Sequence, residues 1–253
     1  MQRNELNRPG GPAAVSSREA VTVCAPETCR SCTARPFSVC APVVDSDLPE
    51  FFGLAQHLHV EPRQTLCHEG DPARYVFSIS RGAVSLSKTL PDGRRQITGF
   101  LQAGDFIGLS HGEVCSHTAE ALTTVKVCRF PRERFERYLA EHPPVEHRLL
   151  HMASTELAAA QEQMLLLGRK TAIERVASFL LRQSARAHAI DQAANPVELP
   201  MSRSEIADYL GLTIETVSRT ITRLRRCGAI ELRGTYTVFI KSEEALRRLA
   251  EGG

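Results

Sequence analysis

Residues 201–230, MSRSEIADYLGLTIETVSRTITRLRRCGAI, restrict the possible folds more than any other segment of the chain. Ser202 followed by Glu205 has the spacing of a capping box and predicts the start of a helix, and Gly211 predicts its end. Thr213 is placed to cap a second helix. Apolar residues recur at helical spacing and predict a buried side on each helix: Ile206, Ala207 and Leu210 on the first, Val217, Ile221 and Leu224 on the second. Two short helices joined by a glycine turn are typical of a helix-turn-helix.

The second helix, predicted over residues 214–226, carries side chains suited to reading DNA. Glu215, Ser218 and Arg219 are spaced i, i+3, i+4, so they project together from its first turns, where a recognition helix meets base edges. Arginine can donate two hydrogen bonds to guanine, glutamate can accept one from the cytosine amino group, and serine is short and adaptable. Candidates for phosphate contacts are Thr213, Thr216, Arg223, Arg225 and Arg226. Downstream, AIELRGTYTVFI alternates like two strands around Gly234 and predicts the wing of a winged helix.

Charge supports this interpretation only locally. The whole chain has a formal net charge of +2, which says little about partners. Residues 201–241 contain seven Lys and Arg against four Asp and Glu, an excess that favours a phosphate-facing module. A surface helix with solvated charges is the alternative, and the combination of cap, glycine turn and basic run disfavours it.

Short strands broken by turn signals characterise residues 48–130. Val84 and Leu86 alternate with polar neighbours as in a half-buried strand, and Asp92-Gly93 predicts a hairpin turn between two such runs. The pattern favours an antiparallel sandwich or roll.

A long amphipathic helix is expected after Pro143-Pro144. Its apolar residues fall at intervals of three or four along one side: Leu149, Ala153, Leu157, Ala160, Met164 and Leu167. We interpret this side as a two-fold coiled-coil seam, and packing within one chain is the alternative. A second amphipathic stretch contains Ile173, Val176, Phe179 and Leu180, and residues 185–196 are interpreted as a loop.

These elements predict an α+β chain in four parts. We expect a disordered tail over residues 1–23, a cysteine segment and β-roll over 24–142, a dimerisation helix over 143–168, and a winged helix-turn-helix domain over 169–253.

Cysteines form the second chemical signal. Cys29, Cys32 and Cys40 have the spacing Cys-x2-Cys-x7-Cys, and Cys128 lies at the end of a predicted strand. Four thiolates can hold tetrahedral zinc or a [4Fe–4S] cluster, and ligand count does not separate the two. Cys24 is a rival ligand and Cys115 a weaker one, whereas Cys67 and Cys227 are expected to pack as small apolar residues.

Taken together, the chain resembles the CRP/Fnr superfamily of bacterial regulators from about Cys29 to its C-terminus, and within it the oxygen-responsive Fnr and FnrN branch. The resemblance lies in LGLTIETVSR, GRRQITGF, LQAGDFIGL, VCRFP and LLLGRKTAIERVASFL. It implies an oxygen-labile [4Fe–4S] cluster on Cys29, Cys32, Cys40 and Cys128, with cysteine spacing similar to the FnrN arrangement. It further implies a homodimer that binds palindromic double-stranded DNA with half-sites similar to TTGAT, and a loop over residues 90–95 that faces RNA polymerase.

One position departs from the enteric members of that branch. They carry an acidic residue in the dimer helix that opposes association without the cluster, and the matching residue here is Ala160. Removal of that charge predicts a more permissive dimer and a less steep response to oxygen, which Gln161 and Glu162 could partly restore.

Other classes fit less well. No Arg occurs between Arg95 and Arg129, so a cyclic nucleotide would lack a bidentate phosphate partner in the roll. Scattered histidines, with no nucleophile and base pair, argue against an enzyme. A regulator with structural zinc, without a cluster or with a small-molecule effector remains the alternative. The absence of a long apolar run or signal peptide predicts a cytoplasmic protein that does not enter membranes.

Overall fold

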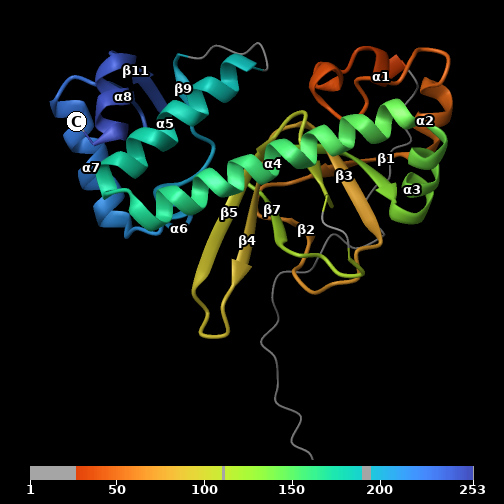
Figure 1. The fold of residues 1–253 in the computed structure, drawn as a ribbon, viewed down its shortest axis with the longest axis horizontal. Helices are drawn as coiled ribbons and strands as arrows, with labels where there is room; N and C mark the ends of the chain where they lie inside the picture. The colour runs from red at the N-terminus through yellow and green to blue at the C-terminus, as the bar shows by residue number, and fades with distance from the viewer. Residues whose placement is uncertain (1–26, 110–111, 190–194, 253) are drawn as a thin grey trace, which may run out of the picture.

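The computed structural model describes residues 27–109, 112–189 and 195–252. The predicted tail over residues 1–23 and the rival ligand Cys24 lie outside them. The described chain forms a β-roll, a long connecting helix and a C-terminal domain of helices and short strands (Figure 1).

The roll consists of two four-stranded sheets in which all neighbouring strands are antiparallel. In spatial order, the first contains β1 (Gln56–Val60), β8 (Val125–Pro131), β3 (Tyr75–Arg81) and β6 (Phe106–Ile107). The second contains β2 (Thr65–Cys67), β7 (Thr118–Ala121), β4 (Ala83–Thr89) and β5 (Arg95–Gln102). The predicted Asp92-Gly93 turn joins β4 to β5, and Gly93 takes the positive φ of 87° that glycine favours.

Side chains along β8 alternate between the two faces of its sheet and so contribute to two separate hydrophobic cores. Val125 and Val127 point into the roll, where they join the cluster between the sheets. Phe130 points outward into a second cluster, formed with the elements that cover this face. Those elements are α1 (Glu27–Arg30), the 3-10 turn Arg35–Phe37, α2 (Leu48–Leu54) and α3 (Arg132–Glu141). We call the second group of residues the outer cluster; it includes Val39, Val43, Phe51, Phe135 and Tyr138.

Helix α4 (Pro143–Arg169) leaves the roll and reaches the C-terminal domain as one continuous helix (Figure 1). It ends one residue beyond the predicted boundary. Prolines in its first turn suit a helix start, because the amides there have no partner within the helix.

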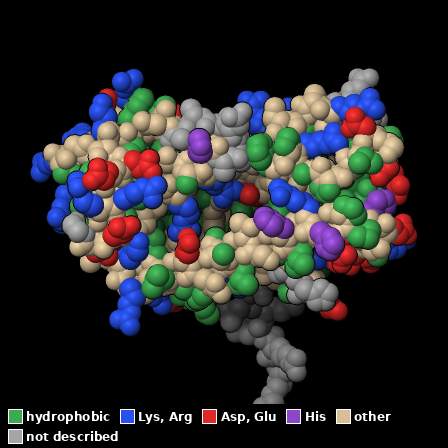
Figure 2. All heavy atoms as spheres, turned by 45° about the horizontal axis from the view of Figure 1, so that its top comes forward, with side chains coloured by type: hydrophobic (Ala, Val, Ile, Leu, Met, Phe, Trp, Pro, Cys, Tyr) green, Lys and Arg blue, Asp and Glu red, His purple; other side chains and the backbone are tan. Residues whose placement is uncertain are grey.

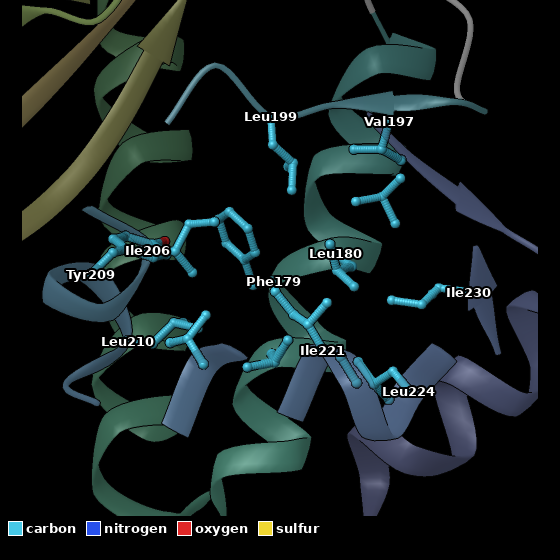
Figure 3. Packing of buried hydrophobic residues seen from close by; sticks show 14 of the residues in the cluster. Phe179, Leu180, Val197, Leu199, Ile206, Tyr209, Leu210, Ile221, Leu224 and Ile230 are labelled. Atoms are coloured by element: carbon cyan, nitrogen blue, oxygen red, sulfur yellow. The ribbon is translucent and has the colours of Figure 1, made fainter. Parts of the chain in front are cut away.

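The C-terminal domain contains α5 (Ala172–Ala189), α6 (Arg203–Leu210), α7 (Ile214–Arg226) and α8 (Glu243–Glu251). A three-stranded sheet of β9 (Val197–Glu198), β11 (Thr237–Ile240) and β10 (Ile230–Arg233) supplies the predicted wing. Leu180, Leu210 and Leu224, from three different helices, meet in one core (Figure 3).

The prediction of a loop over residues 185–196 is wrong for its first part, because α5 continues to Ala189. No Gly or Pro interrupts this stretch before Pro196. Arg186 also forms an ion pair with Asp105 and donates a hydrogen bond to the Phe100 carbonyl, which ties the last turns of the helix to the roll. Residues 190–194 lie outside the described part of the chain.

Among the described residues, no helix is both long and apolar enough to cross a bilayer.

Packing in the outer cluster leads to a testable prediction about the stability of the roll. Phe130 is fully buried, and its ring centroid lies 5.2 Å from that of Phe51 and 5.1 Å from that of Phe135. We expect Phe130→Ala to lower the free energy of unfolding by about 3–5 kcal/mol, because it removes a large side chain from a closed core. Val44→Ala, at a position 58% exposed, is the control and should change it by no more than about 0.5 kcal/mol. Equal effects in chemical denaturation would contradict this assignment.

Candidate nucleic-acid interface and cysteine segment

The turn between α6 and α7 is fixed by local hydrogen bonds. Ser202 Oγ accepts from the Glu205 amide at 3.2 Å, and the Ser202 amide donates to Glu205 Oε2 at 2.6 Å. The predicted capping box is therefore present. Gly211 ends α6 in the left-handed region with φ of 61°, and Thr213 Oγ1 accepts from the Thr216 amide at 3.2 Å to cap α7.

Because one side of α7 is buried in the domain core, its opposite side faces solvent. Val217, Ile221 and Leu224 are buried in the domain core, whereas Glu215, Ser218 and Arg219 are exposed together. Thr213 and Arg223 are also exposed, and Thr216 is half-buried with its hydroxyl 3.1 Å from that of Thr213. The sequence-predicted base-reading side chains thus lie on one accessible face.

Electrostatics keep Glu215 ionised. Its own backbone amide, the Thr213 hydroxyl and the charge of Arg219 all lower the pKa of this carboxyl. An ionised carboxylate only accepts hydrogen bonds, which suits a cytosine amino group or another donor.

Further basic side chains lie at the end of α7 and in the wing. Arg225 and Arg226 are exposed at the end of α7. In the wing, Arg233 lies over the Phe239 ring at 4.3 Å, and Arg233 and Lys241 both pair with Glu231. Figure 2 shows Lys and Arg side chains over the C-terminal domain at the left of the view, interspersed with acidic ones.

The roll holds the helix-turn-helix through contacts that sequence reasoning missed. Arg95 on β5 forms a salt bridge with Asp208 on α6 at 3.0 Å, and Gln96 Nε2 donates to the Asp208 carbonyl at 2.6 Å. Phe100 and Tyr209 pack with their ring centroids 5.0 Å apart. The partners are more than one hundred residues apart in sequence, so no local pattern marks them.

The cysteine segment covers the outward side of β8. Cys29 lies in α1, Cys32 follows shortly after the end of that helix, and Cys40 lies in a turn. Cys29, Cys40 and Cys128 all pack against the outer cluster, and Cys128 Sγ lies 3.6 Å from His57 Nδ1. Three of the four predicted ligands therefore share one apolar neighbourhood, although they come from opposite ends of the roll's sequence.

The thiols are not arranged as a formed metal site. In the described ranges, no group of three or more Cys, His, Asp or Glu side chains has an arrangement that could hold a metal ion. Burial, together with smaller contributions from neighbouring Cys29 and Cys32, raises the pKa of the Cys40 thiol to about 12. In the absence of a cation this environment favours the neutral thiol.

Two buried polar atoms next to these cysteines lack partners among the described residues: His57 Nε2 and the Tyr138 hydroxyl. Burial lowers the pKa of His57, and burial together with Glu50, Asp47 and Cys40 raises that of Tyr138 to about 12. A neutral imidazole and a phenol donor at the margin of a thiol group fit the surroundings of an inorganic sulfur centre. The donor chemistry therefore fits the implied cluster, while the ligand geometry requires the cysteine side chains to move.

The interior of the roll contains a mainly apolar cavity of about 210 Å³. Arg132, which the sequence analysis did not single out, lines it. Its guanidinium donates to the Ala73 carbonyl at 2.8 Å and to the Gly108 carbonyl at 3.3 Å. Because these bonds engage it with the backbone, the cavity does not present it as a free phosphate clamp.

Along α4 the structure divides the residues that we predicted for the seam. Leu149 packs against the outer cluster and Leu167 against the C-terminal core, whereas neighbouring Leu150 is 64% exposed. Leu157 and Met164 are 60% and 65% exposed. Ala160 is exposed and Ala153 half-buried.

Comparison with known proteins agrees with this architecture. Residues 57–142 match the family of cyclic nucleotide-binding domains, and residues 174–249 match the Crp-like helix-turn-helix domain. The nitrogen fixation regulation protein FixK of Bradyrhizobium diazoefficiens is 43% identical over 81% of this chain and 86% of its own length. The transcriptional activator protein FnrL of Cereibacter sphaeroides is 38% identical over 89% of this chain and 92% of its own length.

Among solved structures, FixK2 from Bradyrhizobium japonicum superposes with a TM-score of 0.72 at 38% identity, covering 77% of this chain and 96% of that chain. These relatives are regulators rather than enzymes. From this similarity, and from a capped helix-turn-helix attached by a long helix to a β-roll, we conclude that the chain belongs to the CRP/Fnr family of transcription regulators.

Proposed function

We propose that this protein is a homodimeric transcription activator that binds palindromic DNA and responds to oxygen through a [4Fe–4S] cluster. The observation that carries the DNA-binding part is the exposed face of α7, where Glu215, Ser218 and Arg219 project together from a capped helix. Arg219 would donate to guanine O6 and N7, Glu215 would accept from cytosine, and half-sites similar to TTGAT are the expected targets.

The ligands we propose for the cluster are Cys29, Cys32, Cys40 and Cys128. Thiolates are the donors that iron–sulfur clusters use, and the outer cluster brings Cys29, Cys40 and Cys128 to one face of the roll. When bound, the cluster supplies a centre that oxygen can oxidise and disassemble. Cys128 is held on a strand of a central sheet, so closure around the centre would move the cysteine segment and its contacts with α3 and α4.

One such contact links the cysteine segment to α4. The Arg148 guanidinium on α4 donates to the Phe37 carbonyl and, at 3.1 Å, to the Ser38 carbonyl. Both carbonyls lie between Cys32 and Cys40. A change in this segment would therefore act directly on the first turns of α4.

The second copy is proposed to pair along α4. Leu150, Leu157 and Met164 recur every seven residues and are exposed, with Ala153 and Ala160 at the intervening positions of a heptad seam. This register replaces Leu149 by Leu150 in the predicted seam and leaves Leu167 at its end. Apolar leucine and methionine in solvent gain stability by burial against a partner, and the family regulators act as dimers.

The tip of the β4–β5 hairpin is proposed to face RNA polymerase. Leu90 is 48% exposed there, and the turn is closed by the Gly93 amide, which donates to the Leu90 carbonyl at 2.9 Å. A rigid exposed tip is suited to a protein contact.

Replacement of Arg219 tests the reading of bases. Arg219→Ala should weaken binding to a palindromic TTGAT-type duplex by about 1–3 kcal/mol and relax the preference at one base position. Arg247→Ala, an exposed arginine on α8, is the control. Fluorescence anisotropy with single-base variants of the duplex measures both the affinity and the base preference. Unchanged discrimination at every base would refute the assignment.

Iron analysis tests the sensor. Protein purified without oxygen should contain about four iron atoms per chain and matching sulfide, and its visible absorbance should bleach in air. Cys40→Ser should lose the iron, whereas Cys227→Ser, at an exposed position after α7, should retain it. Stoichiometric zinc, an absence of metal, or full iron in Cys40→Ser would reject the cluster while leaving DNA binding in place.

A charge in the seam tests the dimer. Leu157→Glu should convert the active protein to monomers in analytical ultracentrifugation, because two carboxylates would meet across the two-fold axis. Leu165→Glu changes an equally exposed leucine on the same helix but outside the heptad seam, and should leave the dimer intact. Dimers of Leu157→Glu at the wild-type dissociation constant would exclude this interface.

A further inference from the structure

Two cysteines inside the roll take no part in the proposed sensing site. Cys67 lies on β2, and Cys115 lies in the segment before β7. Both side chains are half-buried free thiols, and both line the cavity of about 210 Å³. The Cys115 thiol is among the groups that raise the pKa of Cys67. The fold therefore holds a pair of thiols at the wall of an internal cavity.

Backbone hydrogen bonds keep the pair together. The Cys115 amide donates to the Asp71 carbonyl at 2.8 Å, and the Gly70 amide donates to the Cys115 carbonyl at 2.9 Å. Gly70 and Asp71 belong to the turn that directly follows β2, so this turn ties Cys115 to the strand that carries Cys67. Cys67 Sγ also donates to the His117 carbonyl at 3.8 Å. These bonds place Cys115 against the turn that follows the strand of Cys67, and a disulfide requires such a short separation of the two backbones.

We propose that Cys67 and Cys115 form a redox-active dithiol that closes to an intramolecular disulfide when the protein meets an oxidant of the peroxide class. The sulfur of Cys115 attacks one peroxide oxygen, the O–O bond breaks and water leaves, which gives a sulfenic acid. The sulfur of Cys67 then attacks the sulfur of Cys115. The S–S bond forms, the S–O bond breaks, and the departing hydroxide takes the Cys67 proton as a second water. Two thiols lose two electrons and the peroxide gains them.

Burial of Cys67 is the reason for placing it in the second step. Burial and the nearby Cys115 raise the pKa of Cys67 to about 12. Burial therefore favours the neutral thiol of Cys67 over the thiolate. Cys67 suits the second step, where a neighbouring sulfenic acid is already in place. His117 lines the same cavity, and burial lowers its pKa, so its imidazole is neutral there.

The cavity gives the oxidant room and gives the reaction a consequence. A volume of about 210 Å³ is enough for several water-sized molecules, and peroxide is little larger than water. Glu156 of α4 lines the same cavity. A disulfide would therefore stiffen a wall that the connecting helix shares.

This site is separate from the proposed cluster ligands. Cys67 packs against the hydrophobic core between the two sheets of the roll. Cys29, Cys40 and Cys128 instead pack against the outer cluster of hydrophobic residues. Failure of one proposal therefore leaves the other standing.

Peptide mapping tests the dithiol in the full chain. Reduced protein is treated with hydrogen peroxide, its remaining thiols are alkylated, and the digest is analysed by mass spectrometry without reduction. We expect a Cys67–Cys115 cross-linked peptide in the wild type and in Cys227→Ser, its loss in Cys67→Ser and Cys115→Ser, and its disappearance after dithiothreitol. Oxidation of Cys115 to the sulfinic acid, or disulfides that exclude this pair, would overturn the proposal.

A bidentate reagent supplies a second measurement on unmutated protein. Phenylarsine oxide binds two neighbouring thiols through one arsenic atom. At one equivalent over the metal-loaded chain, it should protect Cys67 and Cys115 together from alkylation. Protection of neither, or of one alone, would show that the two sulfurs do not act as a pair, whether or not any variant folds.

Discussion

An apolar stripe on a single unbroken helix is the constraint on which the rest of the structure depends. α4 runs from the outer cluster of the roll to the core of the C-terminal domain, and it buries one side at each end. Between those ends Leu150, Leu157 and Met164 remain exposed. Burial of that stripe against a second copy would align two roll domains and two α7 helices in one step. Under the proposed function, the helix would convert a change in association into a change in DNA-reading geometry.

The first turns of α4 contact the cysteine segment, and its last part contacts α6 of the C-terminal domain. At its start, Arg148 donates to the Phe37 and Ser38 carbonyls, which lie between Cys32 and Cys40, so the helix is linked directly to the cysteine segment. Near its end, the Gln163 amide donates to the Tyr209 carbonyl of α6 at 2.9 Å. Arg95 and Gln96 brace the same α6 from the β4–β5 hairpin. A ligand that favours one arrangement of the first end shifts the population of the other by its differential affinity.

Local chemistry made most of the fold predictable. Ser202 and Glu205 specify a helix start through a capping box, and Asp92-Gly93 specifies a hairpin, because each depends only on nearby backbone. Features that depend on distant packing were not predictable. The pair of Arg95 with Asp208, the helical state of residues 185–189, and the choice of Leu150 over Leu149 are decided by contacts between domains. Cys67 was expected to be a packing residue, and only the folded roll places it beside Cys115.

Under the proposed function, cluster occupancy and pairing along α4 change together as one event. Native mass spectrometry of protein prepared without oxygen, before and after brief exposure to air, measures both properties on the same ions. The account predicts dimers that carry one cluster per chain before exposure and cluster-free monomers afterwards. Dimers that persist unchanged after the cluster mass is lost, or monomers that retain it, would contradict the account.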